Sequence, residues 1–204
     1  MTHYVRSTLL QQYLPLLASG KVRDVYTLNQ SELLLVTTDR ISGVHSCHFY
    51  ACHMLIEGSA FDVVMKNPFT QRGAVLNQMS AFWFEKLQEI LRKSEPTCGS
   101  HFKHLGIPDE LRQRLRTDHH EDLLAWLESR SMVVKKLTMV PIESIVRGYV
   151  TGSAWASYQK DGTILGRKTS TGLVESQKLE KALWTPSTKA PVGERDESIT
   201  PEEG

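Results

Sequence analysis

The stretch "GKVRDVYTLNQSELLLVTTD", residues 20–39, decides how the first part of the chain folds. Its first half alternates around Val22, the polar Asp24 and Val25, and its second half contains the apolar run Leu33 to Val36. Both patterns are typical of β-strands, and the polar "NQSE" between them has the chemistry of a turn. The sequence therefore predicts a β-hairpin here.

A helical repeat follows this hairpin in "VLNQMSAFWFEKLQEILRK", residues 75–93. The spacing predicts one apolar helical stripe, which we expect to pack into the core. The stripe consists of Leu76, Met79, Trp83, Leu87 and Ile90.

Two further strands and a helix are predicted in the second half of the chain. Met132 to Leu137 and Glu143 to Val150 have strand patterns, with Pro141 at the join, where a missing N–H is tolerated. Ser153 is a candidate N-cap of the helix "AWASYQKD", and Gly162 is expected to end that helix.

Composition limits the function classes. The chain has 204 residues, enough for one core or two small domains, and a net charge of +1. That charge gives no argument for nucleic acid or a membrane as partner, and no apolar run approaches the thickness of a bilayer. Three cysteines make no disulfide framework, so we expect a reducing, cytoplasmic setting.

The stretch "GKVRDVY", residues 20–26, has the chemistry of a phosphate contact. Gly20 opens a strand, and the cationic Lys21 and Arg23 follow at alternate positions, so a backbone N–H and two positive charges can lie along a phosphate chain. On its own the pattern also fits a turn glycine and two solvated cations on an edge strand.

The stretch "RGYVTGS", residues 147–153, suggests a second anion site. Arg147 ends a strand and Ser153 begins a helix, whose N-terminal N–H groups attract negative charge. A capped helix beside a structural arginine explains the same pattern.

Glu143 lies in an otherwise apolar strand and needs a partner, either a ligand or Arg147, unless it simply faces the surface. Lys189 is a lone lysine in "TPSTKA" and indicates nothing by itself.

Taken together, six stretches carry a resemblance to a known family: "GKVRDVY", "TTDRIS", "RGAVLNQMSAFWF", "VVKKLTMVPIESIVRGYVTGSAW", "GLVESQKL" and "TPSTKA", in that order. The chain resembles phosphoribosylaminoimidazole-succinocarboxamide synthase (SAICAR synthetase) of the fungal type, and "VPIESIVRGYVTGS" fits the first family signature at each position. The resemblance implies an α+β fold with a strand-rich N-terminal lobe, residues 1–137, and the beginning of an ATP-grasp-type lobe, residues 138–204.

The family activity that this resemblance implies is an ATP-dependent ligation in de novo purine biosynthesis. L-aspartate is joined to a carboxyaminoimidazole ribonucleotide through phosphorylation of the imidazole carboxylate and attack by the aspartate amine. A non-catalytic fragment with residual nucleotide binding, or with no stable fold, is the alternative. No oligomeric state is implied.

The resemblance also implies roles for particular residues, without assigning a catalytic one. Gly20, Lys21 and Arg23 match the loop over the ATP phosphates, and Lys189 matches a lysine that contacts the nucleotide. The residues that match the ribonucleotide site or shape the substrate pocket are Arg147, Ser153, Asp62 and Glu143. The family's magnesium ligands match nothing in these 204 residues, so we expect the chain to be an incomplete product, with those ligands in a segment that would follow.

An atypical segment, "GVHSCHFYACHMLIEGS", interrupts the family pattern at residues 43–59. Without it, "DRIS" runs directly into "AFDV", as in the family. We interpret it as a retained intron or a gene-model error, with a lineage-specific loop as the alternative. Zinc donors gather at His45, Cys47, His48, Cys52 and His53, but the C-x4-C spacing has no second cluster of ligands and matches no closed zinc site. We therefore interpret the cluster as an accident of composition and expect no metal there.

Overall fold

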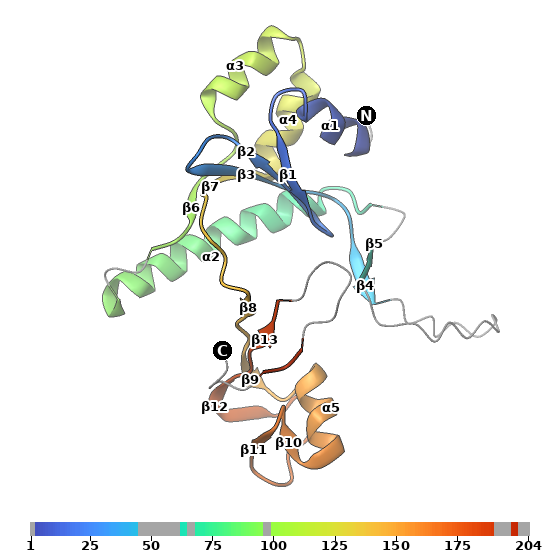
Figure 1. The fold of residues 1–204 in the computed structure, drawn as a ribbon, viewed down its shortest axis with the longest axis vertical. Helices are drawn as coiled ribbons and strands as arrows, with labels where there is room; N and C mark the ends of the chain where they lie inside the picture. The colour runs from blue at the N-terminus through green and yellow to red at the C-terminus, as the bar shows by residue number, and fades with distance from the viewer. Residues whose placement is uncertain (1–2, 45–61, 65–67, 96–98, 190–196, 200–204) are drawn as a thin grey trace, which may run out of the picture. The chain divides into compact units, whose positions relative to one another are not determined.

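The computed structural model describes residues 3–44, 62–64, 68–95, 99–189 and 197–199 (Figure 1). Two compact units make up the chain, Met1–Thr138 and Met139–Gly204. The predicted α+β class is confirmed, because both units combine helices with antiparallel strands. Most of the atypical segment, from residue 45 on, lies outside the described residues.

The first unit is built on a five-stranded antiparallel sheet with the order β1-β2-β3-β7-β6. Its strands are β1 (Leu16–Ser19), β2 (Arg23–Thr27), β3 (Glu32–Thr37), β7 (Ser131–Lys135) and β6 (Phe102–Leu105). The predicted hairpin is confirmed: β2 pairs with β3, with Val25 opposite Leu35. A separate two-stranded ladder joins β4 (Ser42–Val44) to β5 (Asp62–Val64).

The buried face of β2 carries Asp24 and Tyr26, each 1% exposed, while Val25 is half-buried. This differs from what the hydrophobic pattern suggests, since the polar residue lies on the inner face. Adjacent strand residues point to opposite faces, so a buried Tyr26 brings Asp24 inside and leaves Arg23 and Val25 on the other side.

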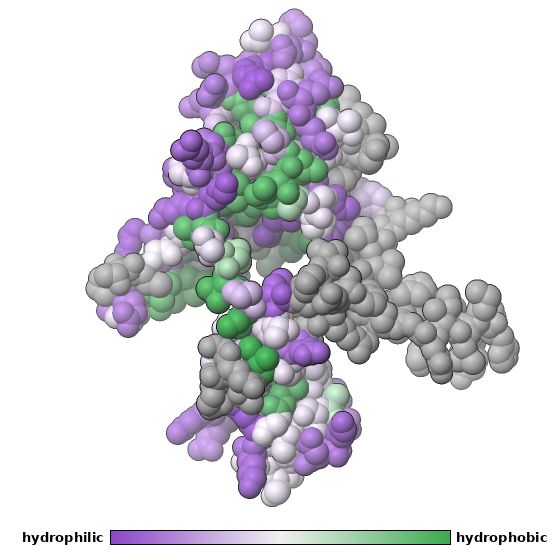
Figure 2. Space-filling model, in the orientation of Figure 1, coloured by the Kyte–Doolittle hydropathy of each residue, from purple (hydrophilic) through white to green (hydrophobic). Residues whose placement is uncertain are grey.

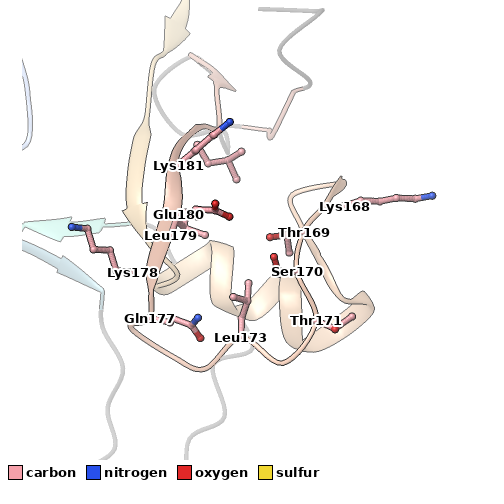
Figure 3. Close-up of a pocket in the computed structure, with 11 residues that line it drawn as sticks. Lys168, Thr169, Ser170, Thr171, Leu173, Gln177, Lys178, Leu179, Glu180 and Lys181 are labelled. Carbon is pink, nitrogen blue, oxygen red and sulfur yellow. The ribbon is translucent and has the colours of Figure 1, made fainter.

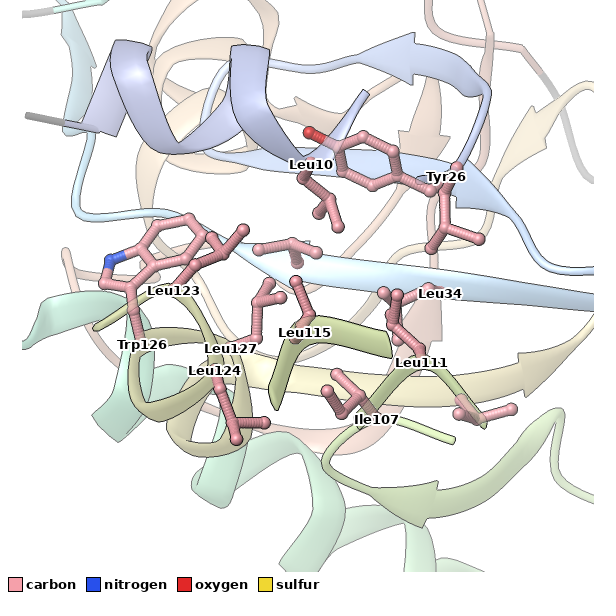
Figure 4. Close-up of a cluster of buried hydrophobic side chains, with 13 residues drawn as sticks. Leu10, Tyr26, Leu34, Ile107, Leu111, Leu115, Leu123, Leu124, Trp126 and Leu127 are labelled. Atoms are coloured by element: carbon pink, nitrogen blue, oxygen red, sulfur yellow. The ribbon is translucent and has the colours of Figure 1, made fainter. Parts of the chain in front are cut away.

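The described residues of the first unit form four helices: α1 (His3–Leu10), α2 (Arg72–Ser94), α3 (Asp109–Thr117) and α4 (Glu121–Arg130). In Figure 4, Leu115 of α3 and Leu127 of α4 point toward the strands that carry Tyr26 and Leu34, and Leu10 of α1 belongs to the same cluster. Helices α3 and α4 begin with acidic residues and carry arginines in the last turn, which complements the helix dipole. Hydrophobic side chains also remain on the surface of both units (Figure 2).

The predicted core stripe of α2 is wrong. Met79 is 52% exposed, Trp83 57% and Ile90 61%, whereas Gly73, Asn77 and Ala81 are buried. The helix approaches the sheet through these small residues, because a Cβ on Gly73 would lie 2.4 Å from the carbonyl oxygen of Thr37. The bulky side chains of Met79, Trp83 and Ile90 therefore lie on the opposite, exposed face of α2.

The second unit consists of short strands around one helix, α5 (Gly152–Asp161). The strands are β8 (Ile142–Glu143), β9 (Val146–Tyr149), β10 (Thr163–Ile164), β11 (Arg167–Lys168), β12 (Lys178–Trp184) and β13 (Ser187–Thr188). Val150, Ala154 and Ile164 form its small core.

The C-terminal end of α5 agrees with the sequence-based prediction, and its N-terminal end does not. Gly162 ends the helix as predicted, with a φ of 74° and its N–H donating to the carbonyl of Tyr158 at 2.8 Å. The N-cap is Thr151, so the prediction of Ser153 as the cap is wrong. Ser153 lies inside the first turn, because Gly152 at a φ of 55° already starts the helix.

Candidate functional site

Arg147 and Ser153 are joined directly in the second unit. Nη2 of Arg147 donates to Oγ of Ser153 at 2.9 Å, and Nε donates to Oγ1 of Thr185 at 3.0 Å. Antiparallel pairing of β9 with β12 places Arg147 opposite Leu183, close to Thr185 in sequence. Thr185 is only 3% exposed, and its N–H donates to the carbonyl of Ile145 at 2.8 Å, so its position is well defined.

The partners of Arg147 make this arrangement suitable for an anion. Both hydroxyl groups are neutral, so they orient the guanidinium without compensating its charge. The nearby N-terminus of α5 adds the positive end of a helix dipole. Sequence reasoning missed Thr185 as the second support, although it lies in the quoted stretch "TPSTKA".

Glu143 of β8 forms an ion pair with Lys189, which directly follows β13 in the second unit. β13 pairs with β8 so that Ser187 faces Glu143, and the N–H of Lys189 donates to the carbonyl of Pro141 at 3.0 Å. The side chains are 38% and 57% exposed, respectively. The sequence left a ligand, Arg147 or an exposed position open for Glu143. The strand pairing brings Lys189 to it, and its predicted contact with a ligand stays a prediction.

The predicted phosphate loop forms a tight turn in the first unit. The N–H of Gly20 donates to the carbonyl of Arg23 at 2.8 Å, Lys21 is exposed, and Arg23 is half-buried at the start of β2. Burial lowers the pKa of the Arg23 guanidinium below its usual value. Its Nε is buried without a hydrogen-bond partner among the described residues. The turn thus carries one exposed cation, Lys21, and one half-buried cation, Arg23.

Behind this turn lies a charged pair that sequence reasoning did not single out. Asp24 is 1% exposed and is contacted by Nη2 of Arg40 at 2.8 Å. Arg40 belongs to the family-like stretch "TTDRIS", in which no residue had a predicted role. The buried aspartate and the arginine become visible as partners only through the pairing of β2 with β3.

Asp62 lies in β5, where its backbone pairs with Val44 of β4. Its side chain is outside what the structure describes, so its predicted role stays a prediction. The candidate zinc ligands, residues 45–53, also lie outside the described part. Within that part no three His, Cys, Asp or Glu side chains gather as metal ligands.

A surface hollow of about 660 Å³ opens beside β12 in the second unit (Figure 3). Its walls include Ser170, Leu173 and Glu180, while Lys168 and Lys178 extend away from it. None of the predicted site residues lines this hollow. We call Arg147 and its two hydroxyl partners, Ser153 and Thr185, the Arg147 cradle. This cradle does not line the cavity.

No helix within the described ranges is both long and apolar enough to span a membrane.

Comparison with known proteins gives one consistent family. A family model described as SAICAR synthetase matches residues 51–204. The phosphoribosylaminoimidazole-succinocarboxamide synthase of Maridesulfovibrio salexigens is 42% identical over 99% of this chain, and that of Saccharomyces cerevisiae is 39% identical over 97%. The predicted fungal type stays a prediction, because a bacterial and a fungal relative match about equally.

Solved structures agree with these relatives. The SAICAR synthase from Saccharomyces cerevisiae complexed with SAICAR matches with a TM-score of 0.71 and 37% identity, over 95% of this chain and 55% of that chain. A type-2 SAICAR synthetase in complex with ADP matches with a TM-score of 0.56 and 17% identity over 91% of this chain and 55% of that one, which supports the fold alone. This chain spans 57% of the length of both curated relatives.

Proposed function

Because the chain belongs to the SAICAR synthetase family, we propose that it acts as an ATP-dependent carbon–nitrogen ligase. Its substrates would be L-aspartate, ATP and 5-amino-1-(5-phospho-D-ribosyl)imidazole-4-carboxylate, and its products SAICAR, ADP and phosphate, in de novo purine (IMP) biosynthesis. The proposal places this reaction in the cytoplasm, with no nucleic acid and no membrane among the partners.

One observation in the second unit carries the proposal: the guanidinium of Arg147 is oriented by two neutral hydroxyls, those of Ser153 and Thr185. The ribonucleotide carries a carboxylate and a phosphate, and a guanidinium with uncompensated charge binds such groups strongly. We assign Arg147 and Ser153 to the ribonucleotide. Glu143, which pairs with Lys189, and Asp62 are assigned to the surroundings of the same substrate.

The chemistry needs an activated carboxylate, because an amine does not displace oxide from a carboxylate ion. An oxygen of the imidazole carboxylate attacks the γ-phosphorus of ATP, the bond to the β-phosphate oxygen breaks, and ADP leaves. The aspartate amine then attacks the acyl phosphate, loses a proton, and phosphate departs with the electrons of the C–O bond. Both steps concentrate negative charge on phosphate oxygens, so fixed cations stabilise them.

Lys21 and Arg23 are the cations that we assign to the ATP phosphates, with Gly20 allowing close approach of the backbone. Arg23 is half-buried, so we assign it to the phosphates through the positive charge of its guanidinium. Lys189 is assigned to the nucleotide as well. Its ammonium pairs with Glu143, and a phosphate could compete for it.

A magnesium ion would reduce the charge of the ATP phosphates when it is bound with the nucleotide. Within the described ranges no cluster of three candidate ligands fits such an ion, so none of these residues is assigned to it.

The test is formation of SAICAR by the purified chain, followed by mass spectrometry. We expect product only when ATP, aspartate and the ribonucleotide are all present, and none from Arg147→Ala. Arg167→Ala is a matched control, because Arg167 lies in β11 of the same unit outside the cradle. Thermal stabilisation by ATP without any product would contradict the ligase proposal and indicate a nucleotide-binding module.

A further inference from the structure

We propose that Arg40 is a positioning residue that shapes the turn around Gly20 and Lys21 for the phosphates of a nucleotide. This inference rests on the proposed function, which assigns the turn to ATP. Arg40 lies in the short segment between β3 and β4.

Three consecutive carbonyl groups of the turn accept hydrogen bonds from Arg40 and Thr38. Nη2 of Arg40 donates to the carbonyl of Gly20 at 2.7 Å, and its Nε donates to that of Lys21 at 3.1 Å. The next carbonyl, that of Val22, accepts from the N–H of Thr38 at 2.9 Å and from its Oγ1 at 2.8 Å. Residues 38 and 40 together therefore determine the direction of all three carbonyls.

The direction of these carbonyls matters for an anionic ligand. A carbonyl oxygen carries partial negative charge, so a turn whose carbonyls faced outward would repel a phosphate. Drawing them toward Arg40 and Thr38 removes this repulsion. The exposed part of the turn then carries the Lys21 ammonium, next to the half-buried Arg23 at the start of β2.

Arg40 also compensates Asp24, a buried carboxylate next to the turn. Oδ1 of Asp24 lies 2.8 Å from Nη2 of Arg40 and accepts from Oγ of Ser19 at 2.6 Å. Asp24 is 1% exposed, so without Arg40 its charge would act at short range in a poorly screened setting. That charge would weaken phosphate binding at Lys21 and Arg23.

The position of Arg40 is itself constrained. Its carbonyl accepts from Nη1 of Arg72 at 2.9 Å, and its N–H donates to Oγ1 of Thr38 at 3.3 Å. Its guanidinium already binds two carbonyls and a carboxylate, and its side chain is 20% exposed. It is therefore placed to act on a nucleotide through the turn, and not by direct contact.

The experiment compares ATP with adenosine, because only ATP carries the phosphates. Isothermal titration calorimetry is carried out on the 204-residue chain, on Arg40→Lys and on Lys21→Ala, with magnesium present. Lysine retains the charge beside Asp24 but cannot hold two carbonyls and a carboxylate at once. We expect Arg40→Lys to weaken ATP binding about tenfold and to change adenosine binding less than about twofold.

Arg112→Lys is the matched control. Like Arg40, Arg112 binds both carboxylate and carbonyl groups: it pairs with Glu128 and Asp109, and it donates to the carbonyl of Ile107 at 3.1 Å. We expect it to leave ATP affinity unchanged. If Arg40→Lys does not fold, as judged by its thermal transition, Thr38→Val tests the same point by removing the hydroxyl that donates to Val22.

The outcomes separate the inference from the function on which it rests. If Lys21→Ala weakens ATP binding while Arg40→Lys and Thr38→Val do not, the inference is wrong and the nucleotide assignment stands. An equal loss of ATP and adenosine affinity in Arg40→Lys would also overturn it, because such a loss reports general distortion. If the parent chain does not bind ATP, the nucleotide assignment and the inference are both wrong.

Discussion

Nη2 of Arg147 lies 2.9 Å from Oγ of Ser153, so β9 is joined to the first turn of α5 by one hydrogen bond. The same guanidinium reaches Thr185 from its Nε at 3.0 Å. These two contacts orient a positive charge beside a helix N-terminus.

Arg147→Lys should weaken binding of the imidazole ribonucleotide about tenfold or more, because lysine cannot reproduce the planar set of donors. Thr185→Val should weaken it less, since it removes only one support of the guanidinium. Calorimetric titration with the ribonucleotide measures both effects. Arg167→Lys serves as control, and a loss of equal size in that variant would contradict the assignment.

Gly73→Ala should lower the free energy of unfolding by about 2 kcal/mol, because the added Cβ overpacks the contact between α2 and β3. It would lie 2.4 Å from the carbonyl oxygen of Thr37, which cannot move without disturbing the sheet. Urea denaturation measures the change. Gly99→Ala is the matched control: nothing lies within 4 Å of its added Cβ, and its effect should stay within about 0.5 kcal/mol.

Arg130→Met should lower the free energy of unfolding by about 2 kcal/mol, because it leaves Asp39 partly buried without its counter-charge. Nη1 of Arg130 lies 2.9 Å from Oδ1 of Asp39, with the side chains 7% and 17% exposed. Asp39 also accepts from the N–H of Gly73 at 2.8 Å, so it holds the start of α2.

A double-mutant cycle isolates this pair. Asp39→Asn combined with Arg130→Met should cost less than the sum of the two single changes, with a coupling of about 1 kcal/mol. Strictly additive losses in urea denaturation would show that the pair contributes nothing beyond its separate contacts.

The pKa of His101 should change when the positive charge of Arg23 is removed or offset. Burial is the larger cause that lowers the pKa of His101 below its usual value of 6.5, and the charge of Arg23 lowers it further. The folded state therefore takes up this proton only at a lower pH than the unfolded state. This contribution reduces stability as the pH falls from 6.5 through the folded pKa.

Arg23→Gln should raise the pKa of His101, as followed by the ring-proton shifts in an NMR titration. Saturation with ATP should raise it as well, because the phosphates would offset the charge of Arg23. Arg112→Gln is expected to leave the titration unchanged. A His101 pKa that responds to neither Arg23→Gln nor ATP would refute the proximity of these charges.

Leu87 and Leu127 test which helix faces are buried. Leu127 is fully buried, so Leu127→Ala should cost about 3 kcal/mol of unfolding free energy through loss of burial and a cavity. Leu87 is 48% exposed, and Leu87→Ala should cost less than about 1 kcal/mol. Thermal and urea denaturation compare the two, and equal losses would mean that the α2 stripe is packed after all.

Local patterns were enough to predict several features correctly. The hairpin from Arg23 to Thr37 follows from two strand patterns around a polar turn, and the end of α5 follows from Gly162. The ordered motifs, above all "VPIESIVRGYVTGS", were enough to indicate the family that the comparisons then showed. Each of these signals depends on residues that lie close together in sequence.

The remaining features depend on contacts between distant segments, which no local pattern contains. The hydrophobic repeat of α2 predicts a helix, but the small residues Gly73 and Asn77 face inward because α2 must come close to β3 and β7. Asp24 is buried because it shares a strand face with Tyr26, and Glu143 meets Lys189 because β8 pairs with β13. Strand register and packing distance select these partners, and both are set by the whole fold.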